Sequence, residues 1–324
     1  MEQRKFKPFG NISALSLGGG GIGNVWGETS RSERVSTVSL AIESGINHFD
    51  MAPMYGKGEA ERVVGEVLKG RDHSAINLTT KCRLGTVTDS EVYTRLNNSL
   101  CRSLETMGVD KVNLFLLHSQ LIEDDYQLPF LNEHRATNAT TLSCYYNAVI
   151  PAFKMLQKEG KIDNWGIGLG QEDALIKAIN HEYPPEAMQC AVNILNSIGA
   201  IGYISENSDP NRVLSECQKK DIPILAIRAV QAGALTSSMD RKPHASGMDI
   251  ADFIDFEKAL PFRKLANEWG ESPASLAHRF SLSVKKVSSV VLGVKNRKEL
   301  QECIDAEKKG KLNSYQMQTL LNLF

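Results

Sequence analysis

Eight strand-like runs recur along the chain, and segments with helical periodicity separate most of them. The runs span residues 13–17, 46–50, 76–81, 112–118, 164–169, 187–192, 222–227 and 287–292. A chain that alternates strands with helices packs the helices outside a mostly parallel sheet. Eight such units predict an α/β fold of the (β/α)8 or TIM barrel class, with long loops at the carboxyl-terminal face. Because no linker or low-complexity run interrupts the chain, we expect residues 1–324 to form one barrel domain.

The helix expected before the fourth strand has the clearest periodicity. Its apolar residues are spaced by four, four, four and three positions, at Val92, Leu96, Leu100, Leu104 and Met107. This spacing places them on one face of a helix, which we expect to pack on the sheet. Gly108 follows at once and predicts the end of the helix, because glycine readily adopts the left-handed conformation found after a helix terminus.

Composition limits the class of function. With 42% hydrophobic and 23% charged residues the chain is typical of a globular protein, and its net charge of -1 provides no broad field for nucleic acid or an anionic membrane. The amino terminus lacks the apolar segment of a signal peptide, and no window is long enough to span a membrane, which predicts a cytoplasmic protein. The six cysteines form no CxxC pair, so we expect reduced thiols and no metal site. No pattern indicates an oligomeric state.

Ionisable side chains occur at three consecutive strand ends. Asp50 ends the second strand-like run, Lys81 ends the third and His118 ends the fourth. Tyr55 follows Asp50 on the connection to the next helix. Working residues of α/β barrels gather at the carboxyl ends of strands, so we expect these four side chains to form a catalytic group. Taken singly, a strand-end aspartate can simply cap a helix, and a lone histidine can be a satisfied polar group.

The combination suits protonation of a carbonyl oxygen. A tyrosine with its usual pKa of about 10 is a poor proton donor unless its phenolate is stabilised. Lys81 can stabilise it by charge, and Asp50 can hold Lys81 through an ion pair. His118 can hydrogen-bond a substrate oxygen and orient it. Such a group fits hydride transfer from a cofactor to a carbonyl carbon, with Tyr55 as the proton donor.

Two connections after strand ends are too long to be simple turns. Residues 119–144 could shape a substrate pocket or could form a solvated surface loop. Residues 234–255 could fold over a bound ligand. The polar and aromatic residues that suggest these roles are Asp124, Asp125, Tyr126, Phe130, His134 and Arg135 in the first connection, and Arg241, Lys242, His244 and Gly247 in the second.

Glycine fills positions 18–21 after the first strand-like run, and Gly23 follows. A dinucleotide-binding fingerprint would need such a turn to open a helix in an open parallel sheet. Residues 24–27 are a poor helix start and the eight-unit count favours a closed barrel, so we reject that interpretation. We expect Gly20 and Gly21 to let the backbone approach a ligand, with Trp26 on the wall of the pocket.

Two longer segments resemble the aldo-keto reductase family. GINHFDMAPMYGKGEAERVVGEVL is similar to the family signature G-x-N-x-F-D-T-A-x-x-Y-G-x-G-x-S-E, and SLCRSLETMGVDKVNLFLLH is similar to the family's run into its catalytic histidine. Lys81 in LTTKC also matches, and the resemblance covers nearly the whole chain. It implies a (β/α)8 barrel, a nicotinamide cofactor extended across the carboxyl face, and a catalytic tetrad of Asp50, Tyr55, Lys81 and His118.

The resemblance implies a small-molecule substrate, and interconversion of an aldehyde, ketone or aldose with the alcohol or lactone. We expect this carbonyl or sugar to contact Trp26, Tyr55 and His118. Further matches are EGKIDNWGIG at the fifth strand, AVQAGALT after the seventh and LGVKNRKELQEC after the eighth. With the glycine run, they imply that the cofactor is bound by Gly20, Gly21, Asp50, Gly170, Gln171, Gln189, Arg228, Val230, Gln231, Gly233, Gly293, Lys295, Arg297 and Glu302.

Some positions depart from the family pattern. Gly170 and Gln171 stand in place of the usual Ser-Asn pair that holds the nicotinamide carboxamide, where Gln171 could substitute. Arg228 stands where many members carry an aromatic residue, and it could reach the pyrophosphate instead. At the adenosine end, Cys303 replaces an asparagine.

Charges after the eighth strand bear on the choice of cofactor. Lys295 and Arg297 at a helix start favour the 2′-phosphate of NADP(H), whereas Glu299 would repel it. We therefore expect NADP(H) to be favoured, with NAD(H) possible; alternatively, all three are solvated surface charges.

Two other functions stay open from the sequence. The chain could be a non-catalytic cofactor-binding subunit of a larger assembly, as some family members are. It could also be a Schiff-base lyase that uses Lys81 as nucleophile.

Overall fold

A computed structural model of the chain describes residues 1–127, 135–202 and 208–324. The strands in these ranges are β1 (Gln3–Phe6), β2 (Gly10–Ser13), β3 (Leu15–Gly18), β4 (His48–Asp50), β5 (Asn77–Cys82), β6 (Val112–Ile122), β7 (Ala139–Thr141), β8 (Ile162–Gly170), β9 (Ala187–Ala191), β10 (Ile224–Ile227) and β11 (Val287–Leu292).

The helices in the described ranges are α1 (Gly19–Ile22), α2 (Arg31–Glu43), α3 (Glu59–Leu68), α4 (Asp89–Met107), α5 (Arg135–Asn138), α6 (Leu142–Cys144), α7 (Ile150–Lys158), α8 (Glu172–Ile179), α9 (Pro210–Lys220), α10 (Ile250–Lys258), α11 (Leu260–Glu268), α12 (Pro273–Ser283), α13 (Arg297–Lys308) and α14 (Ser314–Leu321). A π-helical turn, η2 (Tyr145–Val149), joins α6 to α7. Two 3-10 turns, η3 (Gly199–Gly202) and η4 (Gln231–Gly233), follow β9 and β10.

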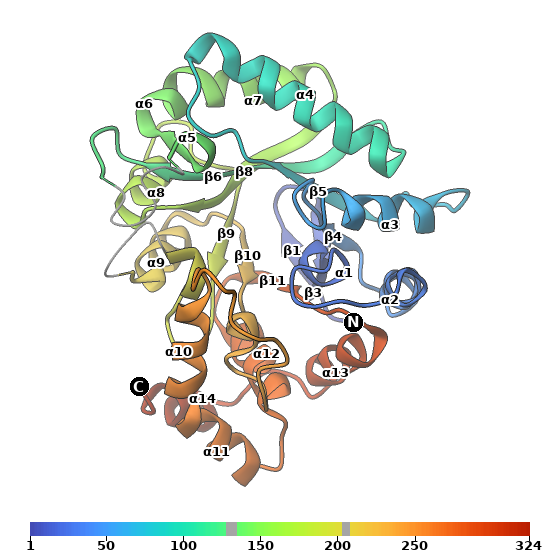
Figure 1. The fold of residues 1–324 in the computed structure, drawn as a ribbon, viewed down its shortest axis with the longest axis vertical. Helices are drawn as coiled ribbons and strands as arrows, with labels where there is room; N and C mark the ends of the chain where they lie inside the picture. The colour runs from blue at the N-terminus through green and yellow to red at the C-terminus, as the bar shows by residue number, and fades with distance from the viewer. Residues whose placement is uncertain (128–134, 203–207) are drawn as a thin grey trace.

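Eight of these strands form a closed parallel barrel with the helices outside it (Figure 1). Around the barrel the order is β3, β4, β5, β6, β8, β9, β10 and β11, which is their order in the chain, and β11 pairs with β3 to close the ring. The prediction of a (β/α)8 barrel is confirmed. Because the strands are parallel, all their carboxyl ends lie at the same end of the barrel.

The fourth barrel strand is longer than the sequence predicts. β6 continues to Ile122, so residues 119–122, which we expected in a loop, are strand. The extension pairs with β7 through Leu121 and Thr140, and both residues are buried. The connection that follows also contains α5 and α6, while Phe130 and His134 lie outside the described residues. Periodicity could not predict the extension, because β7 comes from a separate part of the chain.

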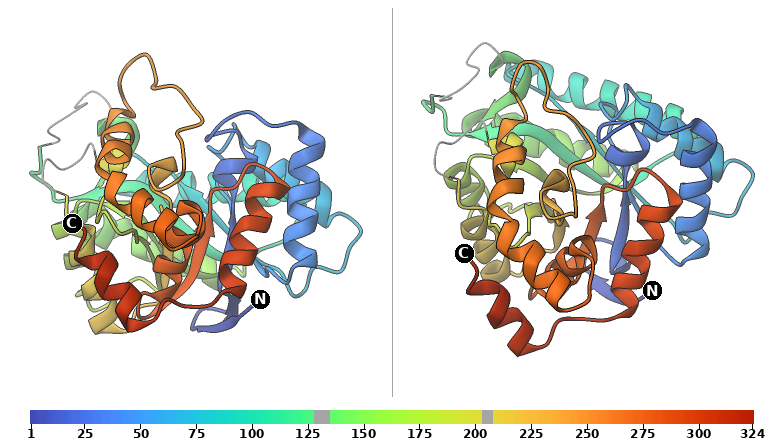
Figure 2. Two further views of the ribbon diagram at one scale, coloured as in Figure 1. Left: turned by 90° about the horizontal axis from the view of Figure 1, so that it is seen from below. Right: turned by 60° about the horizontal axis from the view of Figure 1, so that its bottom comes forward.

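One apolar cluster of the core lies between strands and helices, and another lies inside the barrel. The five predicted apolar residues of α4 are all buried in the outer cluster, and Gly108 ends that helix with φ 69°, which confirms both predictions. Inside the barrel, Phe6 and Ile12 of the β1–β2 hairpin pack with Leu114 and Leu225. Figure 2 (left) shows this hairpin at the lower edge and the long orange segment before α10 at the upper edge. The hairpin therefore closes the amino-terminal end and leaves the carboxyl end for a site.

In the described ranges, no helix has the length and apolar character needed to cross a bilayer.

Candidate functional site

The carboxyl ends of β4, β5 and β6 bring the four predicted catalytic side chains together. Asp50 ends β4 and Lys81 lies near the end of β5. Tyr55 follows β4, and His118 lies within β6. Lys81 Nζ donates hydrogen bonds to Asp50 Oδ2 at 2.8 Å, to the Met51 carbonyl oxygen at 2.9 Å and to the Tyr55 hydroxyl at 3.2 Å. All three ammonium protons of the lysine therefore have an acceptor, and one acceptor is the phenol.

Burial makes the charges of this group depend on one another. The side chains of Lys81 and Asp50 are 0% and 3% exposed, and removing one partner of such a pair leaves an uncompensated charge. Burial by itself lowers the pKa of Lys81, but the charge of Asp50, together with Tyr55 and the hydrogen bonds to both residues, outweighs it and holds that pKa above its usual value. Burial raises the pKa of Tyr55, and the Lys81 ammonium opposes this only in part. Tyr55 is therefore a protonated phenol at neutral pH.

His118 completes the group as an uncharged imidazole. Its ring lies edge-on to the ring of Tyr55, with centroids 6.0 Å apart and an interplanar angle of 85°. Burial, followed by the positive charges of Lys81 and Arg83, lowers the pKa of His118 well below its usual value. A neutral imidazole has one N–H donor, so it can share a substrate oxygen with the phenol without adding charge.

Gln189 on β9 connects the tetrad to another wall of the barrel. Its Nε2 donates to Asp50 Oδ1 at 3.0 Å, so each oxygen of Asp50 accepts a hydrogen bond. A small pocket lies beside Gln189, and its other lining residues include Gln120, Gly168, Leu169 and Ile227. Mainly apolar walls with the amide groups of Gln120 and Gln189 suit a planar ring that carries a carboxamide. The residues present therefore fit a nicotinamide cofactor.

Gly170 and Gln171 are both committed to the packing of α8. A Cβ added at Gly170 would lie 2.7 Å from Leu175 Cδ2 and 2.8 Å from the Leu121 carbonyl oxygen. No side chain fits there without movement. Gln171 is the N-cap of α8, where its Oε1 accepts a hydrogen bond from Ala174 N at 3.0 Å. To bind a carboxamide through its side chain, Gln171 would have to give up this cap.

The glycines at the first strand end are close to protein groups. A Cβ added at Gly20 would lie 2.7 Å from Trp26 Nε1, and one at Gly293 would lie 3.1 Å from the same atom. A Cβ at Gly21 would overlap the Val294 carbonyl oxygen. The half-buried Trp26 indole thus lies over two glycines, at the point where the first and eighth barrel strands meet. This position is compatible with the pocket wall predicted for Trp26.

The two cations predicted for the adenosine end are each paired with carboxylates. Lys295 Nζ contacts Asp240 of the long segment before α10, and it lies 3.3 Å from Glu299 Oε1. Arg297 binds Glu33 of α2 through its backbone N–H, Nε and Nη2, at 2.9, 3.1 and 2.9 Å. Sequence analysis missed Glu33 and Asp240, because nothing in their local sequence links them to residues after β11.

Glu302 lies further along α13 and contacts α12. Its carboxylate accepts a hydrogen bond from Ser272 Oγ, and Ser272 is the N-cap of α12. The neighbouring Cys303 has its Sγ 3.6 Å from His278 Nε2. For Glu302 to contact an adenosine through the same oxygen, this hydrogen bond would have to be released or shared.

The turn after β10 contains Arg228, Val230, Gln231 and Gly233, all predicted to bind the cofactor. The side chain of Arg228 is only 7% exposed; its guanidinium pairs with Asp252 of α10, and its Nε donates to Gln231 Oε1 at 2.7 Å. The Gln231 side chain is fully buried. Both side chains bind protein partners, and the backbone N–H groups of Gln231 and Gly233 donate to the Arg228 and Val230 carbonyl oxygens. The remaining backbone groups of the turn are therefore the part best able to contact a ligand.

A hydrogen-bonded layer one step below the tetrad was missed by the sequence analysis. His48 Nδ1 lies 2.7 Å from Ser16 Oγ, and its Nε2 lies 2.7 Å from Thr79 Oγ1. Ser16 Oγ lies 2.5 Å from Ser289 Oγ, so the layer spans four strands. Burial lowers the pKa of His48 to about 4, which keeps the ring neutral. The sequence contained a signal for this layer. His48 and Thr79 each precede a tetrad residue by two positions, and residues two apart lie on the same face of a strand.

Comparison with known proteins gives a consistent result. The model of the aldo/keto reductase family matches residues 14–323. L-galactose dehydrogenase of Arabidopsis thaliana is 24% identical over 299 residues, which cover 91% of this chain and 84% of the relative. Pyridoxal 4-dehydrogenase of Microbacterium luteolum is 22% identical over 329 aligned residues, which cover 90% of this chain and 88% of the relative.

Among solved structures, an aldo-keto reductase from Bacillus halodurans in its holo form is similar over 100% of this chain and 96% of its own. The TM-score is 0.74 and the sequence identity is 19%. A likeness at this identity supports the barrel fold observed in the described residues.

Proposed function

The chain belongs to the aldo/keto reductase family, and from that premise we propose that it is an NAD(P)(H)-dependent oxidoreductase. It interconverts an aldehyde, ketone or aldose with the corresponding alcohol or lactone. The observation that carries this proposal is the buried chain of hydrogen bonds from Asp50 through Lys81 to Tyr55. Such a chain places a cation where a phenolate would form, as proton donation by a tyrosine requires.

Each tetrad residue has a separate task at the carbonyl oxygen. Tyr55 donates its hydroxyl proton to that oxygen during reduction and takes a proton from the alcohol during oxidation. Lys81 stabilises the phenolate, and Asp50 keeps the lysine charged and in place. His118 donates a hydrogen bond from its neutral ring to the same oxygen and orients it.

The cofactor is bound by residues of several strand ends. A bound nicotinamide supplies or accepts the hydride at the carbonyl carbon. Gln189 and Gln120 hold its carboxamide, the backbone of residues 228–233 holds the pyrophosphate, and Lys295 and Arg297 hold the adenosine end. Trp26 forms a wall of the substrate pocket beside Tyr55 and His118.

NADP(H) is the favoured cofactor under this proposal, by a small factor. Lys295 and Arg297 supply two positive charges near the amino end of α13, where the helix dipole also attracts a phosphate. Glu33, Asp240 and Glu299 already bind these cations and weaken the preference. Exposed charge pairs are worth only about 0.2–1 kcal/mol each, so the expected preference is a few-fold.

A Schiff-base lyase is disfavoured by the state of Lys81. A lysine nucleophile needs a lowered pKa and a free lone pair. Lys81 has a raised pKa, and its ammonium donates three hydrogen bonds. Trapping with borohydride in the presence of a carbonyl compound should therefore leave the lysine unmodified.

The proposal is tested by titrating the protein with NADPH and NADH and then assaying a carbonyl panel in both directions. The two relatives are named for L-galactose and for pyridoxal, so the panel includes aldoses and aromatic aldehydes. Reduction should be constant with pH near neutrality and should fall as the pH rises through the raised pKa of Tyr55, because the proton donor is then lost. Cofactor binding without turnover of any compound would instead support a non-catalytic subunit.

A further inference from the structure

The turn after β10 has an unusual backbone. Arg228, Gln231 and Ala232 have φ angles of 59°, 46° and 50°. Residues with a side chain disfavour this left-handed region, because Cβ approaches the following carbonyl oxygen. Three such residues within five positions persist only when the surrounding structure holds them.

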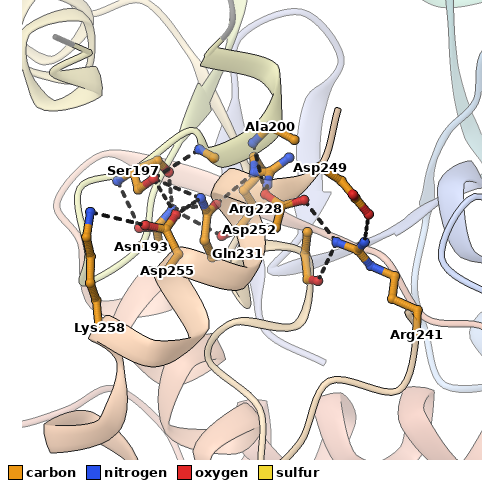
Figure 3. A network of polar contacts seen from close by, with 12 residues as sticks. Asn193, Ser197, Ala200, Arg228, Gln231, Arg241, Asp249, Asp252, Asp255 and Lys258 are labelled. Atoms are coloured by element: carbon orange, nitrogen blue, oxygen red, sulfur yellow. Dashed lines mark hydrogen bonds and ion pairs between the residues drawn. The ribbon is translucent and has the colours of Figure 1, made fainter. Parts of the chain in front are cut away.

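A cluster of polar side chains provides that support (Figure 3). We call it the α10 cluster, and it consists of Ser197, Arg228, Gln231, Asp252 and Asp255. Its centre is the amide of Gln231, whose Nε2 donates to Asp255 Oδ2 at 2.7 Å and to Ser197 Oγ at 3.0 Å. The other atom of that amide, Oε1, accepts from Arg228 Nε, and the guanidinium of Arg228 pairs with Asp252. Each side of the turn is therefore attached to a carboxylate of α10.

The same carboxylates organise two more segments at the carboxyl end of the barrel. Asp252 Oδ1 also accepts the backbone N–H of Ala200 at 3.0 Å, in the η3 turn after β9. Its Oδ2 lies 2.9 Å from Arg241 Nη2, in the long segment before α10. A Cβ added at Gly199 would lie 2.6 Å from Arg228 Nη2, so the backbone of η3 packs directly on the cluster. The α10 cluster thus joins the connection after β9 to two parts of the connection after β10.

Burial makes the contacts between the turn and α10 costly to break. The side chains of Asp252 and Asp255 are 2% and 6% exposed. A buried carboxylate without its partners costs a large desolvation penalty, and so does a buried guanidinium. The cluster is stable when the turn keeps Arg228 and Gln231 directed toward α10, and this requires the left-handed backbone.

We propose that Asp252 and Asp255 are positioning residues for cofactor binding, which hold residues 228–233 in the conformation that presents the backbone of the turn to the cofactor. The inference rests on the proposed function, since that turn is assigned there to the pyrophosphate. Neither carboxylate touches the cofactor. Their effect passes through the side chains of Arg228 and Gln231.

The test compares Asp255→Asn with the parent. The variant keeps the size of the side chain and removes its charge. We expect the Kd of NADPH to rise about tenfold, because the turn is no longer preorganised. The value of kcat at saturating cofactor should stay within about twofold, because the tetrad is unchanged. In the cofactor-free protein, amide hydrogen exchange of residues 228–236 should become faster.

Glu271→Gln is the matched control. The side chain of Glu271 is 7% exposed and pairs at 2.6 Å with Arg279 of α12. Removing its charge should lower the Tm, because it breaks a buried ion pair. It should not change the Kd of NADPH or the amide hydrogen exchange of residues 228–236. A Kd change of equal size in the control would overturn the proposal, because the effect would then be general destabilisation.

A rescue separates backbone positioning from other roles. Adding Ala232→Gly to Asp255→Asn should recover about fivefold of the lost affinity, since glycine adopts a positive φ without a Cβ penalty. No recovery would overturn the positioning mechanism. If Asp255→Asn does not fold, Ser197→Ala removes one hydroxyl of the cluster and should raise the Kd about threefold by the same loss of preorganisation.

The failures of the two proposals are distinguishable. A parent protein that binds neither nicotinamide cofactor would overturn the proposed function. Normal binding by the parent, with unchanged Kd and unchanged exchange in Asp255→Asn, would overturn only the role of the α10 cluster.

Discussion

Two buried ion pairs lie at the carboxyl end of the barrel, and they are built in different ways. Asp50 and Lys81 come from the neighbouring strands β4 and β5, whose backbone pairing includes Asp50 with Thr79. Arg228 and Asp252 join a turn to a helix, and the turn has a left-handed backbone. Strand pairing fixes the first pair in place, whereas the second pair helps to fix the backbone that carries it.

This difference suggests a division of labour between the two walls of the site. The wall formed by β4, β5 and β6 carries the proposed proton donor and needs accurate geometry, which strands supply. The wall formed by residues 228–233 and α10 is held by side chains, so its conformation is more easily changed. Substitutions in the first wall should change kcat or stability, and those in the second should change the Kd of the cofactor.

The largest expected effect is that of Tyr55→Phe on the first wall. The variant removes the proposed proton donor and little else, so kcat should fall about 10²- to 10⁴-fold. The Kd of NADPH, measured by fluorescence titration, should stay within a few-fold. Near-normal kcat would show that Tyr55 is not the donor, and a large change in Kd would show that the two walls are not separate.

Lys81→Met should destabilise the protein by about 3–5 kcal/mol, because it leaves the buried carboxylate of Asp50 without its cation. Lys111 offers a matched control: its Nζ is also 2.8 Å from a carboxylate, that of Asp163, but these side chains are 55% and 35% exposed. Lys111→Met should cost no more than about 1 kcal/mol. Denaturant unfolding measures the free energy of unfolding of both variants. Equal losses of stability would mean that burial does not strengthen the pair of Asp50 and Lys81.

His48 should make stability depend on pH. Its folded pKa of about 4 lies below the usual 6.5, so the unfolded chain binds the proton first. The contribution of neutral His48 to the free energy of unfolding is therefore complete above pH 6.5. It is lost as the pH falls from 6.5 toward 4, by about 3 kcal/mol in total. His48→Gln cannot titrate and should show a smaller decline over this range in urea unfolding. An identical decline would assign the effect to other groups.

The smallest expected effect concerns the adenosine end. Lys295→Ala should weaken NADPH binding a few-fold and leave NADH binding nearly unchanged, because Asp240 and Glu299 already share the charge of Lys295. Asp240→Asn should shift the balance toward NADPH, because it removes a competing carboxylate from Lys295. Equal losses for both cofactors in Lys295→Ala would leave the NADP(H) preference without a residue to support it.

Much of the first wall could be predicted from the sequence. Asp50, Lys81 and His118 each lie on an apolar strand-like run, and the alternation of strands and helices predicts a parallel barrel. In such a barrel the strand ends must converge, so their proximity follows from the pattern. Less of the second wall could be predicted, because no strand pairing or helical periodicity links Arg228 to Asp252, which lies 24 positions away.

The sequence by itself determined the eight-stranded barrel, the apolar face of α4 and the convergence of the tetrad. Helical periodicity can be read from neighbouring residues, and in a parallel barrel the order of the strands already brings their carboxyl ends together. Only the tertiary structure decided that Arg228 and Gln231 turn toward α10, that carboxylates bind Lys295 and Arg297, and that His48 joins a buried polar layer. These outcomes depend on which side chains from distant segments meet in a buried space. A buried charge or amide takes whichever partner satisfies it there, and local sequence does not specify that partner.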